Sequence, residues 1–432
     1  MTVAQPPREV GFNLSDLDFW GLPRRRREAA FAELRALPEP VFFPEMPVPF
    51  IRTGPGYYAL VRHADVVEAS RRPDVFSSEP TSTSIADMPG YMARYFGSMI
   101  NMDDPRHAKI RRIVSRAFTP RVLAKLETDL QAAATRIVDD LVARGPGADF
   151  VETVAARLPL AVICDMMGVP PHRRAMVLER TNVILGLGDP EYSGLDPAAS
   201  PDGRLTRPAT LYALLRVMTA GYELNHLAMK LARLRRREPG DDLVSALVQA
   251  EVDGERLTDQ EIGSFFILLV VAGNETTRNA IAHGLTLLTD HPAQRDLLLA
   301  DFEGRIGGAV EEIVRMSTPV IQFRRTLTRD HEMNGHRYRR GDKVLLFYNS
   351  ANRDAAVFDD PDAFDITRDP NPHVGFGGPG PHYCLGANLA RREITVMFRE
   401  LFTRLPDLRA AGRPDRLFSN FINGVKHLPC TF

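Results

Sequence analysis

One cysteine lies inside a short run that is dense in glycine and proline, between Phe376 and Gly386. Three glycines, Gly378, Gly380 and Gly386, flank Cys384. Glycine lets the backbone turn tightly and brings amide N–H groups close to the sulfur. Such donors stabilise a thiolate and adjust its bond to a metal, and a helical pattern directly after the run adds the positive end of a helix. An isolated cysteine is otherwise most often a small buried hydrophobic residue, so this setting favours a metal-binding thiolate instead.

A second constraint is a long helix predicted from Thr258 to about Asp290. Thr258 and Glu261 have the spacing of a capping box, and His291-Pro292 marks the end. At 1.5 Å per residue the helix spans about 48 Å, the width of a whole domain. From Phe265 to Ala272 it is apolar on nearly every face, so we expect it to be buried.

The middle of this helix interrupts the apolar pattern between Ala272 and Thr277 with a glycine, an asparagine, an acid and two threonines. Polar groups in a buried helix cost free energy unless they are bonded or functional. From the helix alone, a satisfied buried polar cluster and a functional site both agree with this pattern.

The whole chain predicts a mainly α protein with a smaller β part (α+β). Its 432 residues are 44% hydrophobic and carry a net charge of −1, which indicates a globular protein and argues against nucleic-acid binding through overall charge. Helical periodicity also covers about 121–143 and 209–237. Residues 41–85 are β-rich, with a strand at 57–61, and short β segments return after residue 320, at 343–348 and 418–422. With no repeat and no obvious linker, we expect a single domain over residues 1–432.

The segment from Gly186 to Pro208 contains four glycines and four prolines. A loop of this length inside a compact domain is often a lid over a binding site. A surface insertion agrees with the composition equally well, so both interpretations stay open.

Sorting signals are absent from the sequence. Residues Met1 to Arg8 contain no apolar core of a signal peptide, and the longest apolar run, Phe265 to Ala272, is far shorter than the roughly 20 residues of a membrane helix. Three cysteines, Cys164, Cys384 and Cys430, are too few for a disulfide framework. We therefore expect a cytoplasmic protein that does not span a membrane.

The run around Cys384 resembles the haem-binding loop of cytochromes P450, and the resemblance extends over the chain beyond residue 10. It implies the fold of that family, a triangular, prism-like single domain with a long central helix over the haem. It also implies that the thiolate of Cys384 is the axial ligand of the iron of haem b and that His382 donates to a haem propionate. The family usually has phenylalanine seven residues before the cysteine, where this chain has Gly377. The remaining loop positions implied to contact haem are Phe376, Gly378 and Gly386.

The polar segment of the long helix resembles the oxygen-binding motif of the family. The resemblance implies that the small residues Ala272 and Gly273 leave space for dioxygen in a locally distorted helix. It further implies that Thr276 donates a hydrogen bond to dioxygen and that Glu275 relays protons, roles that need groups able to donate and to be reloaded from solvent. A non-catalytic haem carrier or gas sensor, the alternative from another class, needs no such relay.

Cationic positions also match the family. Haem carries two carboxylates, so cations and histidine donors are expected around its pocket. The implied propionate-binding residues are His107, Arg111 and Arg325. Glu312, Arg315 and Arg368 match the structural salt bridge that supports the fold behind the haem.

Within the family, the resemblance is closest to lipid hydroxylases of mycobacterial type. It implies a monooxygenase that inserts one oxygen atom into an unactivated C–H bond, at the end of a methyl-branched or isoprenoid lipid. Hydroxylation of a steroid side chain is the alternative. The substrate-lining positions of these relatives map onto apolar residues, namely Phe96, Ile100, Leu268, Val271, Val320 and Phe421.

Electrons have to come from outside, because no flavin or iron–sulfur segment is recognisable. We expect them to pass from NAD(P)H through a ferredoxin reductase to a small acidic ferredoxin that docks on the cysteine side.

Overall fold

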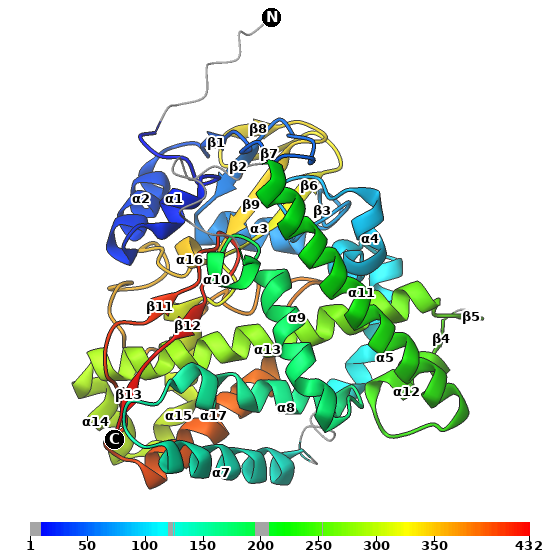
Figure 1. Cartoon of the computed structure of the whole chain (residues 1–432). Helices are drawn as coiled ribbons and strands as arrows, with labels where there is room; N and C mark the ends of the chain where they lie inside the picture. The colour runs from blue at the N-terminus through cyan, green and yellow to red at the C-terminus, as the bar shows by residue number, and fades with distance from the viewer. Residues whose placement is uncertain (1–9, 120–123, 125, 195–206, 253) are drawn as a thin grey trace, which may run out of the picture.

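The structure is a computed structural model that describes residues 10–119, 124, 126–194, 207–252 and 254–432. Helices form most of the molecule, and a smaller β part lies at the top of Figure 1, beside the N-terminal helices α1 (Leu17–Gly21) and α2 (Arg24–Ala36). This arrangement confirms the mainly α fold with a smaller β part.

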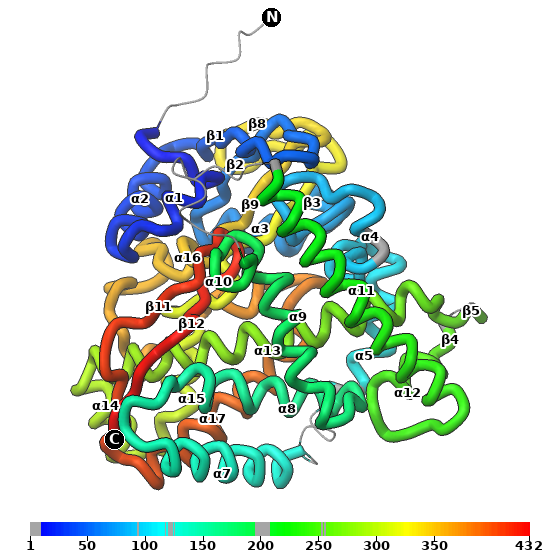
Figure 2. The backbone as a smooth tube through the Cα atoms, viewed as in Figure 1, coloured from blue at the N-terminus to red at the C-terminus, as the bar shows by residue number. Residues whose placement is uncertain are grey.

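Helix α13 (Asp259–Asp290) crosses the middle of the molecule, as Figures 1 and 2 show. Thr258 caps it, and the reciprocal bond from Glu261 completes the capping box. Packing explains why a helix so rich in apolar residues is stable here, since most of its apolar side chains lie in the largest hydrophobic core or pack against it. Helices that pack against it include α8 (Arg157–Met166), α11 (Arg207–Arg237), α15 (Phe302–Ser317) and α17 (Ala387–Arg404). The predicted limits of the long helix are thus confirmed.

Further helices surround this centre: α3 (His63–Arg71), α4 (Gly90–Phe96), α5 (Arg106–Ser115), α7 (Glu127–Arg144), α9 (Arg174–Leu185), α10 (Pro190–Ser193), α12 (Leu243–Gln249), α14 (Pro292–Ala300) and α16 (Tyr348–Ala351). The prediction at 209–237 is confirmed, whereas that at 121–143 begins partly outside the described residues and continues as α7. Part of the segment 186–208 is the short α10, and its residues 195–206 also lie outside the described part. Among the described helices, none has the length and apolarity needed to cross a membrane.

The main sheet has five strands in the order β1-β2-β9-β6-β3. Strands β2 and β9 are parallel, and the other neighbours are antiparallel. The bounds are β1 Phe42–Phe43, β2 Tyr57–Leu60, β3 Phe76–Ser77, β6 Gln322–Leu327 and β9 Lys343–Phe347. The predicted strands at 57–61 and 343–348 are confirmed, each ending one residue early.

The predicted β segment at 418–422 is wrong. It is the turn of a hairpin whose strands are β11 (Asp415–Arg416) and β12 (Val425–His427). The Ser419 hydroxyl accepts from the N–H groups of Phe421 and Ile422 at 3.1 Å each, so the backbone turns here and forms no strand beyond an isolated bridge between Ile422 and Val320. Three other two-stranded sheets are β4 (Glu251–Val252) with β5 (Glu255–Arg256), β7 (His331–Met333) with β8 (His336–Tyr338), and β10 (Arg409–Ala410) with β13 (Cys430–Thr431).

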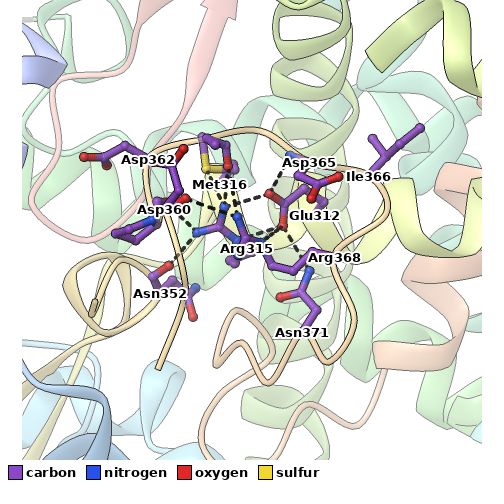
Figure 3. Close-up of polar contacts among 12 residues, drawn as sticks. Glu312, Arg315, Met316, Asn352, Asp360, Asp362, Asp365, Ile366, Arg368 and Asn371 are labelled. Carbon is purple, nitrogen blue, oxygen red and sulfur yellow. Dashed lines mark hydrogen bonds and ion pairs between the residues drawn. The ribbon is translucent and has the colours of Figure 1, made fainter. Parts of the chain in front are cut away.

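Glu312 and Arg315 form a buried ion pair on α15, with 2.7 Å between Nη2 and Oε1 and no exposure of either side chain (Figure 3). Arg368 approaches the same carboxylate at 3.5 Å, so the three residues meet as the sequence implies. The guanidinium of Arg315 also donates to the carbonyl oxygens of Asn352, Pro361 and Ala363 at 2.7–2.8 Å. This one cation therefore joins α15 to the irregular segment that leads to the cysteine loop.

Candidate active site

A cavity of about 220 Å³ lies between α13 and the loop that carries Cys384. Its wall is mostly apolar. Twelve of the site residues predicted from the sequence line it. Those residues are Ile100, Arg111, Leu268, Ala272, Gly273, Thr276, Val320, Arg325, Phe376, His382, Cys384 and Gly386.

The cysteine loop is held in place by its own backbone. The N–H of Cys384 donates to the carbonyl of Phe376 at 2.9 Å, which closes the loop. Gly378 faces Ser70 of α3 instead of the cavity, and a Cβ there would lie 2.4 Å from the Ser70 hydroxyl. Gly386 is the N-cap of α17, which begins at Ala387 as predicted. Close packing against Ser70 thus explains why position 378 is glycine, and Gly386 lies where α17 begins.

Gly377 explains the unusual spacing of phenylalanine and cysteine in this loop. Its φ of +89° is a conformation that favours glycine, so a phenylalanine at this position would be strained. The aromatic ring comes instead from Phe376, which lines the cavity. The guanidinium of Arg391 lies 4.4 Å from the centre of that ring. Phe376 therefore has a defined packing role beside the cysteine loop.

Burial raises the pKa of the Cys384 thiol above its ordinary value. The backbone N–H of Gly386 and the positive charges of Arg111 and Arg391 oppose this shift. The N–H donor beside the sulfur and the two nearby cations thus favour the thiolate, and burial disfavours it. A bound metal cation would supply the stabilisation that the protein groups leave incomplete.

Four basic side chains gather at one side of the cavity. Arg111 donates to the carbonyl of Tyr383 at 2.5 Å, and Arg325 is buried and donates to the carbonyl of Arg324 at 2.8 Å. The rings of His107 and His382 are 4.2 Å apart. His107 lies behind His382 and outside the lining of the cavity, and its buried Nε2 has no hydrogen-bond partner among the described residues.

The environment of these basic groups disfavours their charged forms. Burial, followed by the charges of Arg325, His107 and Arg111, lowers the pKa of His382 to about 2. Burial likewise lowers the pKa of Arg325 and of His107. His107 pairs with Asp104 at 3.3 Å, whereas the buried Arg325 has no ion pair with a carboxylate among the described residues. A buried cation without such a partner is unfavourable, so this side of the cavity is suited to a ligand with negative charges.

The opposite wall is formed by α13, where Ala272, Gly273 and Thr276 face the cavity. The hydroxyl of Thr276 donates to the carbonyl of Ala272 at 2.8 Å. The helix is continuous through this segment, so the local distortion implied by the resemblance is not seen. Gly273 also packs against Ile163 of α8, since a Cβ there would lie 3.0 Å from that side chain.

Glu275 points away from the cavity, although Thr276 next to it lines the wall. It is 1% exposed and pairs with Arg278 one helical turn later. Arg278 in turn donates to Asn182 of α9 at 2.9 Å. Burial raises the pKa of Glu275, and Arg278 opposes the rise. The acid and the alcohol thus lie side by side in sequence but on different faces of α13.

Sequence reasoning missed Glu393 of α17, which lines the cavity and is 2% exposed. Its carboxyl is hydrogen-bonded to the hydroxyl of Thr277, and burial raises its pKa to about 8. Its place on the inner face of a helix that starts just after Cys384 was the available signal. The neighbouring residues Arg391 and Arg392 indicate a turn of the helix that faces solvent, so the sequence does not predict that Glu393 is buried.

The expected substrate-lining residues divide into two groups. Ile100, Leu268 and Val320 line the cavity, and Phe96, Val271 and Phe421 do not. Phe96 and Val271 pack against the main hydrophobic core instead. The centres of the Phe421 and Phe323 rings are 5.6 Å apart. Of these two residues, Phe323 lines the cavity.

Haem fits this set of residues. Cys384 offers a sulfur ligand inside a largely apolar cavity, and the group of arginines and histidines matches the two carboxylates of haem in charge. The buried Nε2 of His107, which has no partner among the described residues, agrees with a ligand at that side that can form a hydrogen bond.

Comparisons with known proteins agree with this site. The family model for cytochrome P450 matches residues 224–405. The chain is 50% identical to the methyl-branched lipid omega-hydroxylase of Mycobacterium tuberculosis (strain CDC 1551 / Oshkosh), over 99% of this chain and 96% of the relative. It is 41% identical to the steroid C26-monooxygenase of Mycolicibacterium smegmatis, over 96% and 93% of the two chains.

Solved structures show the same likeness. A cytochrome P450 of Mycobacterium marinum, CYP268A2 in complex with pseudoionone, has a TM-score of 0.91 and 42% identity, over 99% of this chain and all of the other. Members of this family hold haem iron through a thiolate. By these criteria the chain belongs to the cytochrome P450 family and is a monooxygenase.

Proposed function

We propose that this monooxygenase hydroxylates the terminal methyl group of a methyl-branched or isoprenoid lipid. The observation that carries the proposal is the apolar wall opposite Cys384, which Ile100, Leu268, Val320 and Phe323 form. Burying a hydrocarbon chain there contributes about 0.8 kcal/mol per CH₂. The 50% identity to a relative named as a methyl-branched lipid omega-hydroxylase supports this substrate class.

Cys384 would hold the iron of haem b, and Arg111, Arg325 and His382 would hold its carboxylates. His107 would orient His382 from behind, because the two rings are in contact. When bound, haem supplies the activation of dioxygen with electrons from outside the protein. The small side chains of Ala272 and Gly273 would leave the space that dioxygen needs beside α13.

Thr276 would donate a hydrogen bond into the cavity once its hydroxyl leaves the Ala272 carbonyl. Glu275 would reload it with protons, since burial raises the pKa of this carboxyl and so favours the protonated form that can give one. This relay requires Glu275 to separate from Arg278, so the ion pair on α13 would control proton delivery.

Attack at a terminal methyl requires close positioning of the chain end, because the neighbouring tertiary C–H bond is weaker. The side chains of Leu268 and Val320, together with Ile100, would limit how the chain end can turn. Selectivity would thus come from the shape of the wall.

A steroid side chain is the second candidate substrate, because it also ends in a branched pair of methyl groups. The 41% identity to a relative named as a steroid C26-monooxygenase favours it. The rigid ring system would have to fit the same cavity, whereas a branched fatty acid can bend.

The electron donor would be a small acidic ferredoxin, reduced from NAD(P)H by its reductase. In support, exposed arginines lie near the cysteine loop: Arg112 follows Arg111 on α5, and Arg71 ends α3, against which Gly380 packs. Opposite charges across such a surface raise the rate of association. We also place the enzyme in the cytoplasm, in agreement with three cysteines that form no disulfide.

Titration of the haem-loaded enzyme tests the substrate proposal. Methyl-branched fatty acids, straight-chain fatty acids and sterols are added in turn, and the shift in haem spin state is followed by absorbance. The proposal expects the branched acids to give the lowest Kd and a terminally hydroxylated product with a surrogate ferredoxin and reductase. Tighter binding and turnover of sterols would favour the second candidate. NADH consumption without any oxygenated product, from every ligand, would contradict both and favour a carrier or sensor.

A further inference from the structure

A second pocket, of about 40 Å³, lies apart from the cysteine cavity. Helix α2, helix α16, strand β11 and the segment after α15 surround it, and these elements meet on the left side of Figures 1 and 2. A buried water needs about 10–15 Å³ of such volume. The pocket therefore has room for about three waters or one small tetrahedral ion.

The lining of this pocket is strongly cationic. It contains one carboxylate, Glu28, and five arginines, namely Arg24, Arg27, Arg35, Arg353 and Arg416. Arg24 and Arg353 both pair with Glu28, and Arg353 also pairs with Asp362 at 2.6 Å. Arg35 donates to the hydroxyl of Ser350 at 2.8 Å.

Two of the five arginines differ from the others in their partners. Within the described part of the chain, neither Arg27 nor Arg416 has an ion pair with a carboxylate, and the buried Nε of Arg27 has no hydrogen-bond partner. Arg27 instead lies with its guanidinium 5.8 Å from the centre of the Trp20 ring. Burial and the charges of Arg416 and Arg24 lower the pKa of Arg27 to about 10. Burial and Arg24 also lower the pKa of Arg416.

Neutral donors complete the lining. Ser317 is 2% exposed, and its hydroxyl has no partner among the described residues. The side chain of Asn423 donates to the carbonyl of Ser317, which fixes the segment at the end of α15. A protein that crowds half-buried like charges and leaves a buried hydroxyl unpartnered incurs a free-energy cost, which an anion in the pocket would reduce.

We propose that this pocket binds a single oxyanion of the phosphate class, coordinated by Arg27 and Arg416 with Ser317 as a further donor. Arginine presents paired N–H groups that match the oxygens of phosphate. The ligand is either free phosphate or the phosphomonoester of a lipid headgroup, which share this chemistry.

The pocket shares a wall with the cysteine cavity. Thr318 and Ile321 line the cationic pocket, whereas Pro319 and Val320 between them line the cavity. Val320 also forms a bridge to Ile422 in the hairpin that carries Arg416. An ion held by Arg416 would therefore order the segment that shapes the lipid-binding wall.

The only tryptophan of the chain, Trp20, lines the pocket and provides a local signal. The haem-loaded enzyme is titrated with inorganic phosphate, and Trp20 fluorescence is followed at constant ionic strength against potassium chloride. A second titration uses glycerol 3-phosphate. We expect a saturable change with phosphate that chloride does not give. Equal or tighter binding of glycerol 3-phosphate assigns the site to a headgroup, and its failure to bind assigns it to the free ion.

Variants decide whether the signal belongs to this pocket. Arg416→Gln and Arg27→Gln should each weaken phosphate binding, measured by calorimetry, at least tenfold. Arg25→Gln and Arg26→Gln are matched controls, because both arginines are exposed on α2 outside the pocket. They should leave the Kd unchanged. No binding of either probe, or equal weakening by the control variants, overturns the proposal.

Discussion

The carboxyl group of Glu393 on α17 is hydrogen-bonded to the hydroxyl of Thr277 on α13, and both side chains line the cavity beside Cys384. The pair joins the helix that follows the cysteine loop to the helix that forms the opposite wall. Because burial raises the pKa of Glu393 to about 8, the carboxyl carries its proton at neutral pH. The cavity therefore contains a proton-bearing acid in addition to the alcohol of Thr276.

Replacing Glu393 with Gln should change how stability depends on pH. The pKa of Glu393 lies above its unfolded value of 4.5, so the stability that the protonated carboxyl contributes is complete below pH 4.5 and is lost as pH rises through about 8. The variant has no such loss. Its free energy of unfolding relative to wild type should rise by about 3 kcal/mol between pH 6 and pH 9, because nearly two pH units below the folded pKa each contribute about 1.4 kcal/mol.

Denaturant unfolding at both pH values measures this difference, with the exposed Glu33→Gln as the control. A difference between E393Q and wild type that stays constant with pH would show that Glu393 is ionised in the folded protein throughout.

Local signals account for what the sequence predicts well. The ends of α13 depend on Thr258, Glu261 and Pro292, which lie within one turn of the ends that they define. The place of Cys384 follows from the glycines next to it. Each of these features is complete within a few residues, so it can be recognised without knowing the fold.

Features that depend on packing between distant segments could not be predicted. Glu275 turns away from the cavity because it pairs with Arg278, which in turn donates to Asn182 of α9. Phe421 does not line the cavity, because the hairpin turn brings its ring against that of Phe323. The burial of Glu393 likewise follows from the contact between α17 and α13, which the sequence around Glu393 does not reveal.

Thr276→Ala should lower product formation per NADH consumed by at least about tenfold, since a positioned proton donor contributes roughly 10²–10⁴ in rate. Stability should change little, because the Thr276 hydroxyl bonds within the described structure only to the carbonyl one turn earlier. Thr286→Ala is the matched control. Its hydroxyl makes the same kind of bond, to Ala282 at 3.2 Å, outside the cavity lining. If both variants form as much product per NADH consumed, Thr276 has no role in proton delivery.

Glu312→Gln should destabilise the fold by about 3–5 kcal/mol, because it leaves the buried cation of Arg315 without its carboxylate. The control is Glu152→Gln, which removes an exposed partner of Arg144 and should cost less than about 1 kcal/mol. Chemical unfolding of the two variants gives the comparison. Similar losses from both would mean that the other bonds of Arg315, to three carbonyl oxygens, are sufficient to hold the segment before the cysteine loop.

Cys384→Ala should remove the long-wavelength absorption band that the reduced enzyme shows with carbon monoxide when sulfur is the iron ligand. The chain has two internal controls, because Cys164 and Cys430 are buried away from the cavity. Burial raises the pKa of Cys164 to about 12 and of Cys430 to about 11, and neither sulfur borders the cavity in which the iron would be held.

The variants Cys164→Ala and Cys430→Ala should therefore keep the band at full intensity. Loss of the band in a control variant, or its survival in C384A, would require a different ligand. The expected pattern of one loss and two survivals follows from placement alone, since only Cys384 of the three borders the cavity where the arginines and histidines gather.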